Sequence, residues 1–135
     1  MVCRHMTWSS TKALMVFSLL LIIPLGFAFK FYSEPGNWWF NNYGAGVLYE
    51  IFWILLALLL LHSKCSANLI PVYVFVVTCI LEFLQLWHPP FLDMIRSSFL
   101  GSALIGTTFV WWDFPHYVFG CLIGWIWIRL LLKGA

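Results

Sequence analysis

Residues Leu81–Gly124 read LEFLQLWHPPFLDMIRSSFLGSALIGTTFVWWDFPHYVFGCLIG. The predicted arrangement of the helices depends on these residues, because their apolar runs are interrupted by a Pro-Pro break and by isolated polar side chains. Five polar residues lie inside or at the edge of the apolar runs: Glu82, Gln85, Arg96, Asp113 and Tyr117. Ionisable groups in apolar surroundings are costly, so each needs a partner, water or a function. The stretch therefore indicates a helical membrane protein with a polar cluster inside it.

The composition of the whole chain indicates the same class of protein. Of its 135 residues, 63% are hydrophobic, 20% are aromatic and 9% are charged, and the mean hydropathy is +0.93. Soluble domains carry about 25% charged residues, so this chain cannot build a water-facing surface. At about 20 apolar residues per transmembrane helix, its length allows four or five spans. We expect residues 1–135 to form a single integral membrane domain.

Charge and cysteine content exclude several functions. The formal net charge of +2 is too small to argue for a nucleic-acid partner. The four cysteines show no CxxC or CxxH spacing, so we expect neither a metal site nor a disulfide. The chain carries no nucleophile motif, no HExxH and no acids paired at a catalytic spacing. We predict no catalytic residue, no metal ligand and no cofactor, with an enzyme acting on a lipid phosphate as the least favoured alternative.

Four apolar runs predict transmembrane helices, at about residues 13–30, 44–62, 68–87 and 114–132. The segment between the last two is too short to cross. Its apolar part, residues 97–110, would be about 21 Å long as a helix, and the hydrocarbon core is roughly 30 Å thick. The predicted fold is therefore an all-α bundle of four transmembrane helices, with a short re-entrant or interfacial helix at about 97–111 before the last span.

The basic residues predict the orientation of this bundle. With four spans and a cytoplasmic N-terminus, five of the seven lysines and arginines are cytoplasmic, and Lys30 and Arg96 lie outside. A fifth span would change the balance to three against four, which the positive-inside rule disfavours. We predict a multi-pass protein of the cell (inner) membrane with both termini in the cytoplasm.

This topology brings polar side chains of three spans into the outer half of the membrane. Glu50 lies about 9 Å below the outer end of its span, and Glu82 lies about 8 Å below the outer end of the next. Gln85 shares a helix face with Glu82. Beneath the Trp-rich loop before the second span, we predict a ligand-binding cluster of six residues: Glu50, Glu82, Gln85, Arg96, Asp113 and Tyr117.

Each of these residues also has a structural interpretation. Asp113 precedes Phe-Pro and is suited to capping the last helix. Glu82 and Arg96 are suited to an ion pair that fixes the short helix, and we expect Arg96 to lie within ion-pair distance of Glu82 or Asp113. A structural cluster and a binding site remain equally favoured on these residues alone.

Two glycines predict a close helix contact. Gly120 and Gly124 form a GxxxG pattern in the last span, and such glycines let two helix backbones approach. The partner is either another helix of the same bundle or a second copy of the chain.

A pattern of polar residues and glycines resembles the small bacterial membrane proteins of the family called domain of unknown function 2809. The pattern is Glu82-x-x-Gln85, then Arg96, then Leu104-x-Gly106-x-x-Phe109-x-x-x-Asp113-x-x-x-Tyr117-x-x-Gly120. Tyr43-Gly44 and Val47-Leu48-Tyr49 resemble that family's loop into its second span, and the resemblance covers most of residues 13–132. It implies a multi-pass membrane protein without an established activity. A looser similarity to VanZ-like proteins rests on Glu-x-x-Gln and a following Arg, but residues 97–106 replace the acidic and Asn positions that follow in that family.

The function that these observations favour is binding of an amphiphile or lipid head group at the polar cluster. Arg96 would hold an anionic group, because a guanidinium matches the geometry of phosphate or carboxylate. One alternative is a small accessory subunit of a membrane complex. Another is a proton-coupled transporter that titrates Glu50 and Glu82, although no inverted repeat appears and no acid marks the inner half of a span. The expected partners are membrane lipids, an amphiphilic ligand, and a second copy or a larger membrane complex.

Overall fold

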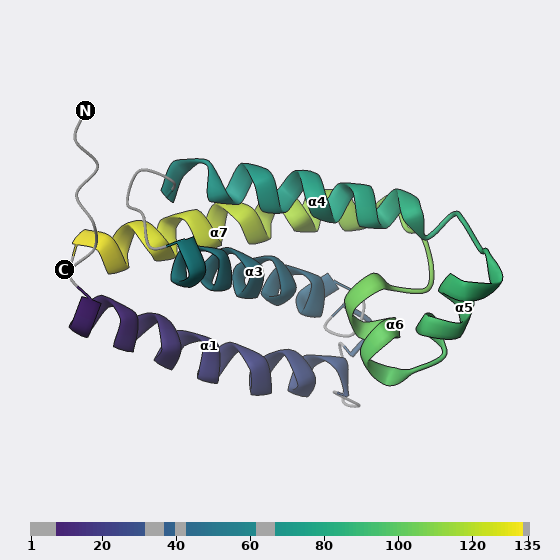
Figure 1. Cartoon of the computed structure of the whole chain (residues 1–135), viewed down its shortest axis with the longest axis horizontal. Helices are drawn as coiled ribbons and strands as arrows, with labels where there is room; N and C mark the ends of the chain where they lie inside the picture. The colour runs from purple at the N-terminus through teal and green to yellow at the C-terminus, as the bar shows by residue number, and fades with distance from the viewer. Residues whose placement is uncertain (1–7, 32–36, 40–42, 62–66, 134–135) are drawn as a thin grey trace.

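A computed structural model describes residues 8–31, 37–39, 43–61 and 67–133 of the chain. These residues form helices and no strand (Figure 1), which confirms the prediction of an all-α fold. In chain order the helices are α1 (Trp8–Lys30), α2 (Asn37–Trp39), α3 (Ala45–Leu61), α4 (Ile70–Leu84), α5 (Pro90–Arg96), α6 (Phe99–Ile105) and α7 (Asp113–Lys133).

The helices α1, α3, α4 and α7 run side by side, and α5 and α6 lie together at one end of them (Figure 1). Both α3 and α7 match the predicted segments 44–62 and 114–132 to within one residue at each end. By contrast, α4 ends at Leu84 rather than at residue 87, and α1 begins at Trp8 rather than at residue 13.

Two of the described helices are long and apolar enough to cross a membrane. The stretches Ser10–Lys30 of α1 and Asp113–Lys133 of α7 each contain 21 residues and have a hydropathy of 2.2 and 1.4, respectively. At 1.5 Å per residue each is about 31 Å long. The helices α3 and α4 are apolar but shorter, and their crossing of a membrane remains a prediction.

The centre of the fold is α3, which packs against α1, α4 and α7. Its buried residues recur at the three- and four-residue spacing of one helix face: Ile51, Ile54, Leu55 and Leu58. The core around this face is completed from three helices by Met15 and Leu19 of α1, Ile70 of α4 and Ile128 of α7.

The contact between α3 and α7 is the most extensive one in the fold, and two glycines make it close. A Cβ atom at Gly120 would lie 2.7 Å from the Cβ of Glu50 and 2.9 Å from the carbonyl oxygen of Val47. A Cβ at Gly124 would lie 2.7 Å from the Cδ1 of Ile54. Both glycines therefore lie against α3 inside the bundle, where the absence of a side chain permits the close contact.

Two acidic side chains are buried, whereas many large apolar side chains are exposed. Glu50 and Glu82 are completely buried, at 0% exposure. Large apolar side chains are exposed on the outer faces of the bundle helices, for example Leu20, Leu60, Ile80, Phe119 and Leu130.

The connection from α4 to α7 is built from two short helices. Pro89 has an extended backbone and Pro90 is the first residue of α5, as expected where a proline follows another residue and starts a helix. The hydroxyl of Ser98 caps α6 by accepting a hydrogen bond from the Gly101 amide at 3.0 Å. With seven residues, α6 is about 10 Å long and too short to cross a membrane. It occupies part of the predicted segment 97–111, and the chain from residue 106 to residue 112 is not helical.

Candidate functional site

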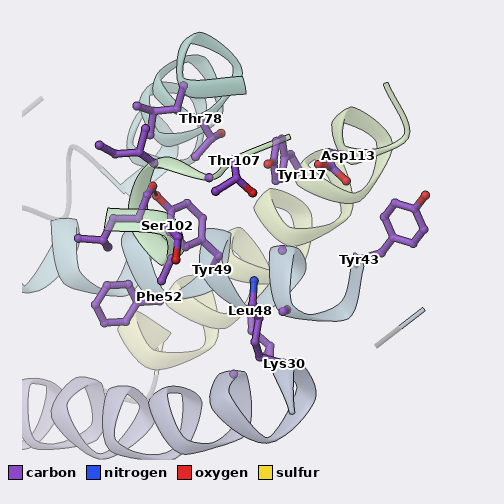
Figure 2. Close-up of a pocket in the computed structure, with 18 of the residues that line it drawn as sticks. Lys30, Tyr43, Leu48, Tyr49, Phe52, Thr78, Ser102, Thr107, Asp113 and Tyr117 are labelled. Atoms are coloured by element: carbon purple, nitrogen blue, oxygen red, sulfur yellow. Dashed lines mark hydrogen bonds between the residues drawn. The ribbon is translucent and has the colours of Figure 1, made fainter. Parts of the chain in front are cut away.

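A pocket of about 720 Å³ lies at the end of the bundle that carries α6 (Figure 2). Residues of α1, α2, α3, α4, α6, the loop 106–112 and the start of α7 line it. Its volume falls within the roughly 300–1,000 Å³ of pockets that bind small molecules. The lining side chains able to form hydrogen bonds are Lys30, Trp38, Tyr43, Tyr49, Thr78, Gln85, Ser102, Thr107, Thr108, Asp113 and Tyr117.

Contacts to two bundle helices hold α6 over this pocket. The ring of Phe99 stacks on Phe27 and Phe31 of the α1 end, with centroid distances of 5.9 and 6.2 Å. The hydroxyl of Tyr49, on α3, donates a hydrogen bond of 2.7 Å to the Leu104 carbonyl, one of the last carbonyls of α6. The short helix is therefore fixed across α1 and α3.

Glu82 ties the other wall of the pocket together. Its carboxylate accepts hydrogen bonds from the Gln85 amide at 3.1 Å, the Tyr117 hydroxyl at 2.9 Å and the backbone N–H of Val110 at 2.9 Å. These donors come from the end of α4, from α7 and from the loop between α6 and α7. A fully buried carboxylate requires such donors, so Glu82 joins three segments that are distant in the sequence.

Gly106 brings the loop onto this cluster. It has a φ of +80°, which a residue with a Cβ rarely adopts, and it follows directly after α6. A Cβ at this position would lie 2.5 Å from Nε2 of Gln85. Only a glycine lets the chain leave α6 in this direction while its backbone lies against the Gln85 amide.

Arg96 does not join the cluster, and the expectation that it lies within ion-pair distance of Glu82 or Asp113 is wrong. Its guanidinium donates to the carbonyls of Leu84 at 3.0 Å and Trp87 at 2.9 Å, and to Asp93 at 3.3 Å. The Leu84 carbonyl also accepts the backbone N–H of Trp87 at 3.0 Å. The Trp87 carbonyl lies beyond the end of α4, where Pro89 and Pro90 have no N–H to donate. The buried Arg96 therefore caps the end of α4 and connects it to α5.

Asp93, which accepts a hydrogen bond from Arg96, also lies beside a histidine. Nδ1 of His88 lies 3.1 Å from the Asp93 carboxylate. This hydrogen bond, with that from Arg96, lowers the pKa of Asp93 below its ordinary value. The three side chains form a small polar junction outside the pocket.

Glu50 is buried between α3 and α7. It is on the α3 face that contacts α7, and the thiol of Cys121 donates a hydrogen bond of 3.1 Å to its Oε2. Glu50 does not line the pocket.

Lys30 is a pocket residue that the sequence interpretation did not include. Figure 2 shows its side chain extending from the end of α1 into the pocket, with Asp113 and Tyr117 on α7 and Thr107 on the loop across from it. Within the part of the chain that the structure describes, no acidic side chain lies within ion-pair distance of Lys30, and no basic one within that distance of Asp113. The sequence feature that could have identified Lys30 is its place as one of two basic residues on the predicted outer side.

The pocket thus brings together half of the predicted cluster. Gln85, Asp113 and Tyr117 line it, and Glu82 lies directly behind them through its hydrogen bonds to Gln85 and Tyr117. Glu50 and Arg96 belong to other contacts. Among the described residues, no group of three or more His, Cys, Asp or Glu side chains is placed to hold a metal ion.

Fold and pocket together define an all-helical protein with two helices of membrane-crossing length and a pocket at one end of its bundle. The chain belongs to the family described as protein of unknown function (DUF2809), whose family model matches residues 36–121. That match contains α3 to α6 and the first part of α7, and so most of the pocket. No solved structure matches the chain.

Proposed function

We propose that this protein is a four-span membrane protein that binds an amphiphile in the pocket. The observation that carries the proposal is the order of lining residues along the helices. On α1 the lining runs from Ile22 to Lys30, and on α4 from Thr78 and Leu81 to Gln85. On α1 the apolar Ile22, Ile23 and Phe27 precede the charged Lys30, which lies at the end of the helix. Over eight residues of α1 this change takes about 12 Å, as it does where an acyl chain meets a head group.

The distribution of side chains supports the placement in a membrane. Exposed Leu20, Ile80 and Leu130 would be unfavourable in water as a continuous surface, and they suit hydrocarbon. The buried Glu50 and Glu82 are placed where polar groups in membrane proteins are found, facing the interior of the bundle. With α6 too short to cross, four helices give an even number of spans and place both chain ends on one side.

The orientation follows from the basic residues. Both termini in the cytoplasm, and the pocket in the outer half of the cell membrane, give the favoured five-to-two distribution of lysine and arginine. Cysteine labelling tests this placement in a variant without the four native cysteines. A cysteine introduced at Ser98 should react with a membrane-impermeant reagent from outside, and one at Ala135 should not. Labelling of the second site from outside would contradict the orientation.

Filling the pocket tests the binding function. Gly26 lines the pocket, and a Cβ there would meet no atom within 4 Å. Gly26→Leu therefore starts a side chain from a lining position whose Cβ has open space, and replacing glycine inside a helix is favourable by about 0.5–1 kcal/mol. We expect Gly26→Leu to fold with an unchanged or higher melting temperature and to lose the lipid that the native protein retains in native mass spectrometry.

The matched control is Ala28→Leu, which adds a similar side chain to the exposed surface of the same helix outside the pocket. It should retain lipid as the native protein does. Equal retention by native protein, Gly26→Leu and Ala28→Leu would show that bound lipid only coats the surface. A stoichiometric protein partner that is lost in Gly26→Leu would instead support the accessory-subunit alternative.

A further inference from the structure

Two oppositely charged side chains line the pocket and do not form an ion pair with each other. Lys30 reaches it from α1 and Asp113 from the first turn of α7 (Figure 2). Neither side chain has an ion-pair partner among the residues described by the structure. Arg96, which was predicted to lie within ion-pair distance of Glu82 or Asp113, instead donates hydrogen bonds to Leu84, Trp87 and Asp93. A ligand that carries both charges would complement these two side chains.

We propose that the head group bound in this pocket is zwitterionic, with an anionic phosphate at Lys30 and a primary ammonium at Asp113. The proposal rests on the proposed function, since it names the class of amphiphile that the same pocket takes. The head group of phosphatidylethanolamine has this chemistry.

The surroundings of Asp113 favour a cation. The carboxyl groups of Glu82 and Asp113 are hydrogen-bonding neighbours, and no basic side chain of the described chain lies at ion-pair distance of either. Two such groups in a site of low dielectric share a proton unless a cation neutralises them, and a bound ammonium would take the place of that proton. A primary ammonium supplies three hydrogen-bond donors to such a site, whereas a trimethylammonium group supplies none.

The surroundings of Lys30 favour a phosphate. The Thr107 hydroxyl lines the pocket, and in Figure 2 it points toward the same space as the Lys30 ammonium. An ammonium and a hydroxyl are both donors to an anionic oxygen. A purely anionic lipid would satisfy this side of the pocket and leave Asp113 without a counter-charge, so a head group with both charges fits best.

The test measures retention of three lipids that share their acyl chains. The purified protein is equilibrated with mixed micelles containing dioleoyl phosphatidylethanolamine, phosphatidylglycerol or phosphatidylcholine, and bound lipid is counted by native mass spectrometry. We expect phosphatidylethanolamine to be retained about tenfold better than the other two, the scale of one charge-assisted hydrogen bond. Equal or better retention of phosphatidylglycerol or phosphatidylcholine would overturn the proposal.

Substitutions of the charged lining residues test which side chain causes the preference for phosphatidylethanolamine. Asp113→Asn should remove the preference for phosphatidylethanolamine over phosphatidylglycerol, while Asp113→Glu should keep it. Lys30→Gln should reduce retention of all three phosphate lipids, and Lys133→Gln, at the other end of α7, should change none of them. Melting temperatures identify any variant that fails to fold. A preference that survives Asp113→Asn would overturn the assignment of the ammonium.

Two further outcomes separate this proposal from the proposed function. If native protein retains no more lipid than Gly26→Leu, binding itself is absent; if it retains all three lipids equally, only the head-group assignment fails. Free phosphoethanolamine is expected not to displace the lipid at equal concentration. Displacement by it would show that a water-soluble compound, rather than an amphiphile, is the ligand.

Discussion

The hydroxyl of Tyr117 on α7 donates a hydrogen bond of 2.9 Å to Oε2 of Glu82 on α4, which lies 35 residues earlier in the chain. This bond closes the wall of the pocket, because Glu82 also holds Gln85 and the backbone of Val110. The same carboxylate therefore decides where α4, the loop 106–112 and the start of α7 lie relative to each other.

Removing the hydroxyl should destabilise the fold. Tyr117→Phe leaves the buried Glu82 with one donor fewer, and an incompletely satisfied buried group costs about 1–3 kcal/mol. Thermal unfolding in detergent measures the loss. Tyr73→Phe is the control, because Tyr73 is on α4 with 65% of its surface exposed. An equal melting temperature for the two variants would show that the Tyr117 hydrogen bond contributes nothing.

Arg96 should be coupled to the end of α4 and not to Glu82. Arg96→Leu removes the donors to the carbonyls of Leu84 and Trp87, and we expect a loss of about 1.5–3 kcal/mol, typical of hydrogen bonds from a charged group. In a double-mutant cycle, Arg96→Leu and Glu82→Gln should be additive within about 0.5 kcal/mol. A rescue of one substitution by the other would mean that the two residues form a pair.

The two glycines of α7 should differ in their tolerance of a methyl group. Gly120→Ala brings a Cβ against the Val47 carbonyl, which is backbone and cannot move away, so we expect a loss of about 1–3 kcal/mol. Gly124→Ala meets the Cδ1 end of the Ile54 side chain, which can change its rotamer, and should cost less. Gly46→Ala is the control, since its nearest contact would be an ordinary 3.6 Å from Tyr117. The reverse order of stabilities would contradict the described contact between α3 and α7.

Gly106→Ala should disturb the pocket. Its φ of +80° disfavours any other residue by about 1–3 kcal/mol, and the added Cβ would displace the Gln85 amide from Glu82. Both the melting temperature and lipid retention should fall. Gly26→Ala, which meets open space, provides the comparison. Unchanged stability of Gly106→Ala would show that the loop leaves α6 by another path.

Acid should weaken the junction between α4 and α5. The hydrogen bonds from His88 and Arg96 lower the pKa of Asp93 from its ordinary 3.8. Because the folded state has the lower pKa, the ionised Asp93 contributes stability above about pH 4, and this contribution is lost as the pH falls toward the folded value. The difference in melting temperature between native protein and Asp93→Asn should therefore shrink between about pH 5 and pH 3. A difference that is constant with pH would contradict the role of this carboxylate.

The apolar runs allowed most of the fold to be predicted. Helices α3 and α7 end where their sequence turns polar, so residues 44–62 and 114–132 located them closely. The start of α1 was missed because Trp8–Lys12 continue a helix without being apolar. Helix α5 was missed because Pro89-Pro90 was interpreted only as the end of a helix, although a proline also begins one.

The site was less predictable, because partner choice depends on geometry. The Glu82–Gln85 spacing identified one contact on a single helix. The partner of Arg96 could not be inferred from charge alone, since carbonyls freed by the break and Asp93, three residues away, compete for it. Lys30 was missed because a lysine at the end of an apolar helix is usually hydrated. The ligand-binding roles of all these residues, and the similarity to VanZ-like proteins, stay predictions.

The contact between Glu50 and Cys121 joins residues that are 71 positions apart, and this has a consequence for biogenesis. On the proposed topology, α3 enters the bilayer well before α7 has been translated. At about 5–20 residues per second, a ribosome makes Cys121 on the order of 4–14 s after Glu50. During that interval the acid has no α7 to shield it from lipid. On this topology Glu50 obtains its full set of hydrogen-bond donors only after the last helix has been inserted.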